Sequence, residues 1–393
     1  MLDIMMKKKI NILSIHSTGL AFGGDETRLL NQCRLFNKDI FSCIVCAPKV
    51  SQGSMASHFE KANIRVIYIK TLVADPKKYI TPLQYLIRAL DFLFYLSQLI
   101  KIVYKEKIDI LDGRLIGGAF LGILIKKLTN LPVIVTLYEI DESKTFYKRV
   151  SRYFLRYSDA IICDSQAKTD ELREWINSSR PAYVLIPSAI ELKFSSDASI
   201  EELKRNKESA GKIVMGQIAR IIPHKGQDLL INAFNNIAKK HIDAELWIIG
   251  YIRDAGYYKD LMDLVKSLNL EHKVRFIHYP GYIGNVFKAI DIQVHPTRKD
   301  SLPNSILEGM SLGVPLISSS IGGIPEMVTH METGLLFDIE NPDELSHCLD
   351  QMLTNANFRQ ALGRAAKKRF DVHFSPDSLT KKLENVFGKI SNQ

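Results

Sequence analysis

Short apolar runs alternate with longer amphipathic segments along most of the chain. Seven runs in the first half are typical of buried strands, and they cover residues 9–15, 41–47, 64–69, 108–112, 132–138, 159–164 and 182–187. Helical patterns lie in most of the gaps between them. Because parallel strands need a crossover connection, the alternation predicts a parallel sheet with helices on both faces.

A polar, irregular segment at residues 188–211 interrupts this pattern. It resumes with strand-like runs at 212–219, 244–250, 273–279, 291–296 and 314–319. We therefore predict an α/β fold with two Rossmann-like, doubly wound parallel-sheet domains joined near residues 187–211. Such sheets bind ligands at the carboxyl ends of their strands, so the loops after the strands are the candidate sites.

The composition is that of a globular protein, with 46% apolar and 24% charged residues. No run of 18 uncharged apolar residues predicts a membrane span, and the start of the chain lacks the features of a signal peptide. The net charge of +9 lies in residues 1–187, which hold 27 Lys and Arg against 18 Asp and Glu, whereas the remaining residues hold 25 of each. This asymmetry predicts an acidic partner or surface for the first half.

Five cysteines are scattered along the chain, at positions 33, 43, 46, 163 and 348. Cys43 and Cys46 form a CxxC pair within a predicted strand, where residues three apart face opposite sides of the sheet. We therefore interpret them as core residues and not as a metal or redox motif, and we expect a reducing, cytosolic compartment.

Two cations follow the predicted strand at 212–219. Arg220 and Lys225 precede Gly226 and a helical pattern. A guanidinium can hold phosphate oxygens in a bidentate manner, an ammonium adds a point charge, and a helix N-terminus favours anions, so the segment predicts a diphosphate site. The Walker glycine pattern is absent, and a solvated loop is the alternative interpretation.

Gly19, Gly23 and Gly24 separate the first strand from a helix that is predicted to begin at Asp25. Paired glycines allow backbone N–H groups to approach a ligand closely. The Rossmann GxGxxG pattern is not matched, and no acidic residue ends the second strand, so the segment does not predict a dinucleotide site.

The segment at 298–319 places two acids on either side of a predicted helix start. Ser301 is the expected N-cap and Pro303 is expected in the first turn, with Asp300 before the helix and Glu308 inside it. Carboxylates accept hydrogen bonds from vicinal hydroxyls, so the motif predicts a polyol site beside an anion site, as a nucleotide-sugar requires. The alternative is that Asp300 only caps the helix and Glu308 only pairs with a neighbour.

Together these motifs resemble the retaining glycosyltransferases of family 4, which have the GT-B architecture of two Rossmann-like domains facing a cleft. The resemblance covers nearly the whole chain. It rests on five motifs in order: the glycines at 23–24, Arg-x4-Lys-Gly at 220–226, the acids at 300 and 308, and the segments at 313–328 and 333–337.

The resemblance implies an acceptor-binding domain at 1–187, a nucleotide-sugar-binding domain at 188–375, and a helix at 376–393 that can return to the first domain. It also implies roles for single residues. Arg220 and Lys225 would neutralise the donor diphosphate, Glu308 would hold the ribose, and Asp300 would hold the transferred sugar. The remaining implied donor-binding residues are Gly23, Gly24, Ser301, Leu302, Pro303 and Asn304. No metal or other cofactor is expected, because the cations take the place of a metal and no DxD cluster lies near the phosphate loops.

The chain departs from the family pattern at several positions. Asp300 stands where the family usually has Glu, and histidines that face the acceptor in relatives are replaced at 112, 114 and 138. The candidates for the acceptor side are therefore His16, Asp112, Arg114, Tyr138 and Glu139. A general base is left open, because in a front-face mechanism the departing phosphate can take the acceptor proton.

Two aromatic and basic segments, at 81–107 and 143–159, fit either sheet-covering helices or docking on an anionic membrane surface. The second places cations at 144, 148, 149, 152 and 156 among five aromatic residues. Neither segment carries an RRM, KH or helix-turn-helix signature, so we expect no nucleic-acid partner.

We therefore expect an enzyme that transfers a sugar, with retention, from a nucleotide diphosphate-sugar to a hydroxyl. We expect a UDP-sugar, although the sequence leaves the choice between UDP and GDP open. The acceptor is expected to be a lipid-linked or surface-polysaccharide oligosaccharide precursor at the cytoplasmic face of the membrane. The alternatives are a catalytically silent partner subunit with the same fold and a membrane-surface scaffold that binds no nucleotide. The sequence does not indicate the sugar, the linkage or the oligomeric state.

Overall fold

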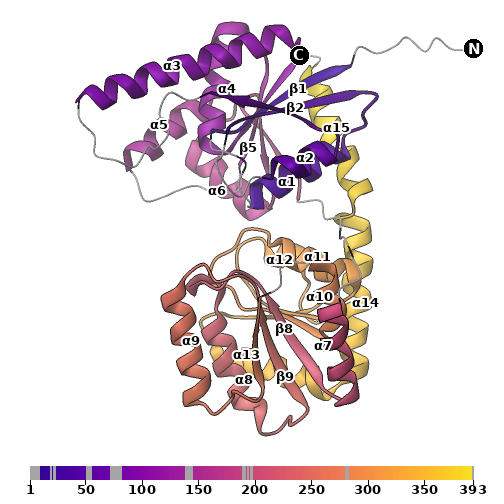
Figure 1. Cartoon of the computed structure of the whole chain (residues 1–393). Coiled ribbons are helices and arrows are strands. Elements are labelled where there is room, and N and C mark those ends of the chain that lie inside the picture. The colour runs from indigo at the N-terminus through magenta and orange to yellow at the C-terminus, as the bar shows by residue number, and fades with distance from the viewer. Residues whose placement is uncertain are drawn as a thin grey trace, which may run out of the picture. The chain divides into compact units, whose positions relative to one another are not determined.

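The structure is a computed structural model of the 393-residue chain. It describes residues 9–391 except for 18–19, 21–23, 50–54, 71–81, 138–144, 188–191, 193, 195–197 and 279–282. Two compact units divide the chain (Figure 1): unit 1 comprises Met1–Ala189 together with Asp377–Gln393, and unit 2 comprises Ile190–Pro376.

Unit 1 is built on a seven-stranded parallel sheet with the strand order β3-β2-β1-β4-β5-β6-β7. Its strands are β1 (Ile10–Ile15), β2 (Phe41–Pro48), β3 (Arg65–Ile69), β4 (Ile110–Arg114), β5 (Val133–Thr136), β6 (Ala160–Cys163) and β7 (Ala182–Leu185). The order reverses direction between β1 and β4, which pair in register from Ile12 opposite Ile110. The carboxyl ends of these two strands therefore form the switch point where open α/β sheets bind ligands.

Helices cover both faces of this sheet, as the buried β1 and β2 residues require. Leu13 and Ile15 pack into a core with α3 (Pro82–Lys105), α4 (Leu115–Thr129), α5 (Thr145–Leu155) and α6 (Gln166–Ile176). Residues that alternate with these, such as Ile12 and Val45, face cores formed with α1 (Gly24–Leu35), α2 (Ala56–Lys61) and α15 (Pro376–Ser391). The apolar runs thus have no polar side because both faces are covered.

Unit 2 repeats the plan with a six-stranded parallel sheet in the order β10-β9-β8-β11-β12-β13. Its strands are β8 (Ile213–Ile218), β9 (Ala244–Ile249), β10 (Val274–Ile277), β11 (Ile292–His295), β12 (Leu316–Ser319) and β13 (Leu335–Phe337). Every strand predicted from the sequence is present, whereas β13 was not predicted, because its three residues are too short for a periodic pattern.

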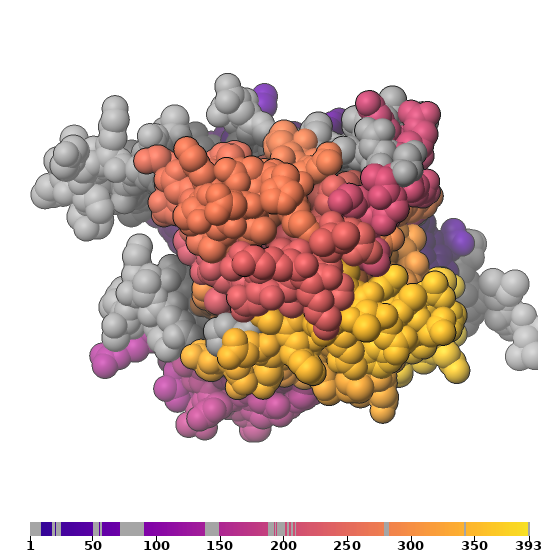
Figure 2. All heavy atoms as spheres, turned by 90° about the horizontal axis from the view of Figure 1, so that it is seen from below, coloured from indigo at the N-terminus to yellow at the C-terminus, as the bar shows by residue number. Residues whose placement is uncertain are grey.

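The helices of unit 2 also lie on both faces of its sheet. Leu246 and Ile248 of β9 face a core with α8 (Gln227–Ala238), α9 (Ala255–Ser267) and α13 (Pro342–Thr354). Trp247 and Ile249 face α10 (Ile283–Ala289). The other helices of the unit are α7 (Ala198–Ser209), α11 (Asn304–Leu312), α12 (Ile324–Met327) and α14 (Ala356–His373). Within unit 2, α13 packs on α8, and Figure 2 shows the coral atoms of the α8–α9 region from below.

The last helix, α15, packs into unit 1 although it follows unit 2 in the sequence. Leu383, Phe387 and Ile390 lie in a core with Ile12 and other sheet residues. The Phe387 ring meets the Phe36 ring edge-on at a centroid distance of 5.0 Å. Both segments that compose unit 1 are therefore needed to close this core.

In the part of the chain that the structure describes, no helix is long and apolar enough to cross a membrane.

We expect Phe387→Ala to destabilise unit 1 by ~3–5 kcal/mol, because it removes a buried aromatic ring and leaves a cavity. Scanning calorimetry measures the change as a lower unfolding temperature of one transition. The matched control is Gly388→Ala, the next residue of α15, where an added Cβ meets no atom within 4 Å. The prediction is wrong if the two variants unfold at the same temperature.

Candidate functional site

Residues of unit 2 that are predicted to bind the donor lie on two loops at one edge of its sheet. Strands β8 and β11 are neighbours and run parallel, so the loops at 219–226 and 296–303 leave the sheet side by side. Lys225 Nζ contacts Asp300 Oδ2 in an ion pair that joins these two loops. The structure thus unites two of the four predicted catalytic residues directly.

The first loop has a conformation that only glycine permits at its end. A single 3-10 turn at Pro223–Lys225 leads to Gly226, which has a φ of 69° and precedes α8. A Cβ at Gly226 would lie 1.9 Å from the carbonyl oxygen of Pro296. Gly226 therefore sets both the turn and the close approach of the two loops.

A second set of contacts holds the same loops from outside. Arg298 donates to both carboxylate oxygens of Asp228, at 2.8 and 2.6 Å, and to the Pro223 carbonyl at 2.8 Å. The Tyr257 hydroxyl donates to Asp228 Oδ1 at 2.7 Å. Burial opposes ionisation of Asp228, but the hydrogen bonds from Arg298 and Tyr257 outweigh it and lower the pKa of that carboxyl.

His295 completes the charged group at the centre of the site. Its Nε2 lies 3.1 Å from Asp300 Oδ2, and the ring is buried at the end of β11. Burial lowers the pKa of His295, against the hydrogen bond and charge of Asp300. Burial by itself would raise the pKa of Asp300, but contacts with His295 and Lys225 hold it well below its usual range. At neutral pH the imidazole of His295 is therefore neutral and Asp300 is a carboxylate.

The start of α11 differs from its prediction. The helix begins at Asn304 with Pro303 as its N-cap residue, so Ser301 is not the N-cap and Pro303 is not inside the first turn. An N-cap at Ser301 would put Leu302 in helical conformation directly before a proline, which the proline ring disfavours. Instead, the Ser301 carbonyl accepts a 2.7 Å hydrogen bond from the Gly323 N–H.

Glu308 lies in the second turn of α11, as expected for an acid beyond the helix start. Burial raises the pKa of its carboxyl to about 7. Burial thus costs the Glu308 carboxylate its solvation and brings no cation to compensate, so hydrogen bonds from hydroxyl groups would stabilise its ionised form.

Arg220, the other predicted cation, is exposed, and its side chain has no polar partner among the described residues.

Unit 1 also gathers charged residues at the carboxyl ends of its central strands. Arg114 donates to Asp25 Oδ1 at 2.7 Å and to Gln32 Oε1 at 2.9 Å. His16 Nε2 lies 3.2 Å from Asp25 Oδ2. Burial lowers the pKa of His16 to about 4, against the nearby charge of Asp25, so the ring is neutral at pH 7.

Asp112 lies beneath this group and is completely buried. It accepts hydrogen bonds from Ser14 Oγ at 2.8 Å and Thr136 Oγ1 at 3.0 Å. Burial raises its pKa, which the charge of Arg114 opposes. At 0% exposure neither Asp112 nor Arg114 reaches solvent, and their contacts hold α1 and the strand ends in place. Their assignment to the acceptor side stays a prediction.

Three predicted residues cannot be placed. Gly23, Tyr138 and Glu139 lie outside the described residues, whereas Gly24 is the first residue of α1. Among the residues that are described, no group of three or more His, Cys, Asp or Glu side chains could hold a metal ion. The expectation of a metal-free reaction stays a prediction.

Sequence reasoning missed His295 and Asp25. His295 lies at the end of a predicted strand, five residues before Asp300, and Asp25 lies at the start of the helix after the glycine loop. Both positions are next to the carboxyl end of a strand, and this could have identified them as candidate site residues. It also missed that Cys43 meets Cys33 of α1, with the sulfur atoms 2.9 Å apart. Cys43 and Cys46 do face different cores, as predicted.

Family models match both parts of the chain. The model described as "Glycosyl transferases group 1" matches residues 199–369, and "Glycosyltransferase Family 4" matches residues 22–194. The chain therefore belongs to the family 4 glycosyltransferases, with the GT-B fold of two Rossmann-like domains.

Similar proteins agree with this assignment. D-inositol 3-phosphate glycosyltransferase of Corynebacterium diphtheriae is 22% identical over 98% of this chain and 95% of its own. The capsular polysaccharide biosynthesis glycosyltransferase CapM of Staphylococcus aureus is 21% identical over 89% and 97%. The structure of Anabaena HepE in complex with UDP matches with a TM-score of 0.81 and 19% identity, over 97% of this chain and 100% of that one. At this identity the structural match shows the shared fold.

The raised pKa of Glu308 predicts a pH-dependent effect on stability. The folded state favours the protonated Glu308 carboxyl. Below pH ~4.5 this carboxyl is protonated in both states and does not change the free energy of unfolding. As the pH rises from ~4.5 to ~7 the unfolded chain ionises first, so the free energy of unfolding falls, and the loss is complete above pH ~7. We expect Glu308→Gln to stabilise unit 2 by ~1–3 kcal/mol at pH 8 and by almost nothing at pH 4, with allowance for partial solvent contact. Denaturant unfolding at both pH values measures this.

The control for that experiment is Glu332→Gln, which removes the same charge from an exposed turn of unit 2. A gain from Glu308→Gln that is the same at pH 4 and pH 8, or that Glu332→Gln reproduces, would contradict the assignment.

Proposed function

We propose that this glycosyltransferase moves a sugar from a UDP-sugar to a hydroxyl of a lipid-linked or surface-polysaccharide acceptor, with retention of anomeric configuration. The observation that carries the proposal is the group formed by Lys225, His295 and Asp300 in front of α11, with Glu308 on the same helix. It combines a cation, hydroxyl acceptors and a helix N-terminus at one sheet edge.

Each part of this group suits one part of a nucleotide-sugar. The N-terminus of α11 and Lys225 would face the diphosphate, because a helix end and an ammonium both stabilise negative charge. Asp300 is ionised at neutral pH and can accept hydrogen bonds from the sugar hydroxyls. Glu308 would accept from the ribose hydroxyls and thereby recover the hydrogen bonds that burial denies it.

Lys225 would serve two partners at once. An ammonium has three donors, so Lys225 can keep its contact with Asp300 and still donate to a phosphate oxygen. His295 would hold the Asp300 carboxylate in position with its Nε2–H and take no part in the proton transfer. Arg220 is exposed and can turn toward the phosphates, where it would supply the second charge that a metal provides in other transferases.

The chemistry requires one bond to break and one to form on the same face of the sugar. The sugar–oxygen bond to the diphosphate breaks, the acceptor oxygen bonds to the anomeric carbon, and the departing phosphate takes the acceptor proton. Charge grows on the phosphate in the transition state, so Lys225 and Arg220 would act where the change is largest. A separate base is not required.

The comparisons support the choice of donor and acceptor class without deciding it. A similar structure, Anabaena HepE, was solved with UDP-glucose as well as UDP. Among similar proteins, CapM is named for capsular polysaccharide biosynthesis. A relative from Corynebacterium glutamicum is a GDP-mannose-dependent mannosyltransferase, and its name gives a monoacylated phosphatidylinositol monomannoside. Both UDP and GDP donors should therefore be tested.

Removal of the phosphate cations should slow the reaction. We expect Arg220→Ala and Lys225→Ala each to lower kcat/KM by ~10²–10³-fold, because each removes an oriented charge at the leaving group. Steady-state kinetics measure the effect. Lys239→Ala is the control, since it removes an exposed cation from the opposite end of α8. Near-normal activity of both site variants would rule out this role.

The two acids should fail differently. Glu308→Gln should weaken binding of free UDP by ~1.5–3 kcal/mol, the scale of a hydrogen bond to a charged group. Asp300→Asn should leave UDP affinity nearly unchanged and lower kcat with the intact donor, because the sugar is the only part of the donor that Asp300 would contact and an amide oxygen can still accept from Lys225. Calorimetry with UDP and GDP gives the affinities. Equal losses of nucleotide affinity in both variants would contradict this division, and absence of any nucleotide binding by the unmodified protein would contradict the proposed function.

A further inference from the structure

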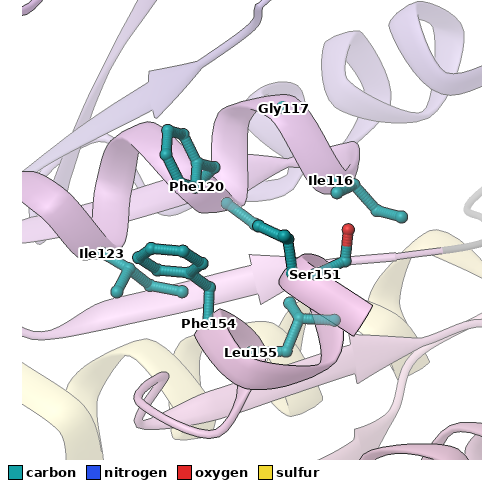
Figure 3. Close-up of a pocket in the computed structure, with 9 residues that line it drawn as sticks. Ile116, Gly117, Phe120, Ile123, Ser151, Phe154 and Leu155 are labelled. Carbon is teal, nitrogen blue, oxygen red and sulfur yellow. The ribbon is translucent and has the colours of Figure 1, made fainter. Parts of the chain in front are cut away.

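A pocket between α4 and α5 of unit 1 has no role in the proposed donor chemistry. It has a volume of about 190 Å³. Its lining residues are Ile116, Gly117, Ala119, Phe120, Ile123, Val150, Ser151, Phe154 and Leu155. The labelled side chains of the two helices point toward one another across it (Figure 3). Apart from Ser151, every side chain in the lining is apolar, and an apolar cavity of ~150 Å³ is already large enough to stay dry and hold benzene.

Aromatic residues and cations lie together beside this pocket. The Phe154 ring of the lining meets Phe120 at 4.6 Å and Tyr153 at 5.7 Å. Lys127 Nζ lies 4.9 Å from the Tyr157 ring centroid and 5.8 Å from that of Phe154. Amphipathic tyrosines and long cationic side chains beside an apolar region are typical of the boundary between hydrocarbon and lipid headgroups.

The charges around the pocket favour an anionic ligand. Arg149, which precedes Val150 on α5, is exposed, and Arg180 lies 5.8 Å from the Tyr157 ring. In the described part of the chain, no carboxylate forms an ion pair with Lys127, Arg149 or Arg180. Their charges are therefore available to a negatively charged headgroup.

The neighbouring helix α3 exposes further apolar side chains. Leu90 and Leu93 are 52% and 58% exposed, and Phe94 is also exposed. This helix contacts the same wall of the pocket, because its Phe92 ring lies 5.9 Å from Phe120. A bilayer surface would cover these side chains, whereas a single small apolar molecule in the pocket would leave them in water.

The pocket also lies close to the switch point of the unit 1 sheet. Its first lining residues, Ile116 and Gly117, follow within one helical turn of Arg114. A Cβ on Gly117 would lie 2.1 Å from Ser17 Oγ, so α4 packs tightly against the segment after β1. Arg149, in the first half of α5, lies at this end of the pocket, whereas Lys127 lies ten residues further along α4, about 15 Å away. An amphiphile with its chain in the pocket would therefore have its headgroup near Arg149 and the residues predicted to face the acceptor, and Lys127 and Arg180 would meet other headgroups of the same surface.

We propose that the pocket binds a hydrocarbon chain of an anionic membrane lipid, and that this lipid is the acceptor. The inference rests on the proposed transferase function and specifies its acceptor as an amphiphile with a negatively charged headgroup. The length of α4 from Ile116 to Ile123 is about 10 Å, which accommodates part of one extended chain and not the face of a protein helix.

Binding of a free hydrocarbon chain tests the pocket without a membrane. We expect cis-parinaric acid to bind the unmodified protein saturably, with a rise in fluorescence. Val150→Phe should lower its affinity at least tenfold, because the added ring fills the pocket. Val372→Phe is the matched control, since it adds the same group to an exposed position of α14 in unit 2. Equal affinity for Val150→Phe and the unmodified protein overturns the proposal, as does an equal loss for Val372→Phe.

Vesicles then test the source of the chain. The protein should sediment with vesicles of phosphatidylglycerol and phosphatidylcholine and only weakly with phosphatidylcholine alone. Lys127→Gln and Arg149→Gln should each lower binding to the anionic vesicles about fivefold. Binding that is independent of phosphatidylglycerol overturns the proposal. So does a dimer, seen by sedimentation velocity, that Val150→Phe dissociates, because a second copy would then be the occupant.

Crosslinking of the unmodified protein tests the pocket independently of whether the Val150→Phe variant folds. A fatty acid with a diazirine in its chain should crosslink to peptides of α4 and α5, and adducts confined to other segments overturn the proposal. Calorimetry with UDP separates this inference from the proposed function. Normal UDP binding without chain binding contradicts only the lipid pocket, whereas chain binding without UDP binding contradicts the transferase proposal.

Discussion

The ion pair between Lys225 and Asp300 is the contact on which the unit 2 site depends. It joins two loops that leave neighbouring parallel strands, and the close approach of Gly226 to Pro296 makes that contact geometrically possible. His295 restrains the same carboxylate from beneath. A site assembled in this way has little freedom to rearrange, so a donor would meet charges that are already oriented, and orientation before binding is what electrostatic catalysis requires.

The two units use buried charge for different purposes. In unit 1, Arg114 and Asp112 have no exposed surface. Arg114 donates to Gln32 of α1, and Asp112 accepts from Thr136 of β5, so the two charges fix the first helix to the strand ends. In unit 2, Glu308 is partly buried with no cation beside it among the described residues, and Arg220 is exposed. Paired charges of the first kind hold a structure together, whereas charges of the second kind are the ones to which the proposed function gives a ligand.

The unit 1 surface adds a third element, an apolar pocket with tyrosines and cations beside it. Phe120 connects this pocket to α3 through Phe92 and to α5 through Phe154. Some of the positive charge of the first half of the chain, on Lys127 and Arg149, thus lies on helices beside α3, which exposes Leu90 and Leu93.

Periodicity and motif spacing determined much of this protein from the sequence alone. Twelve strands, two sheets and the family followed from local patterns, because strand alternation and glycine turns depend on residues close together in the chain. Tertiary structure alone decided the start of α11, the partners of Lys225 and His295, and the burial of Asp112 and Arg114. These depend on residues far apart in sequence, whose proximity is set by strand order. The sequence around a charged residue does not indicate whether its side chain is buried and paired or exposed to a substrate.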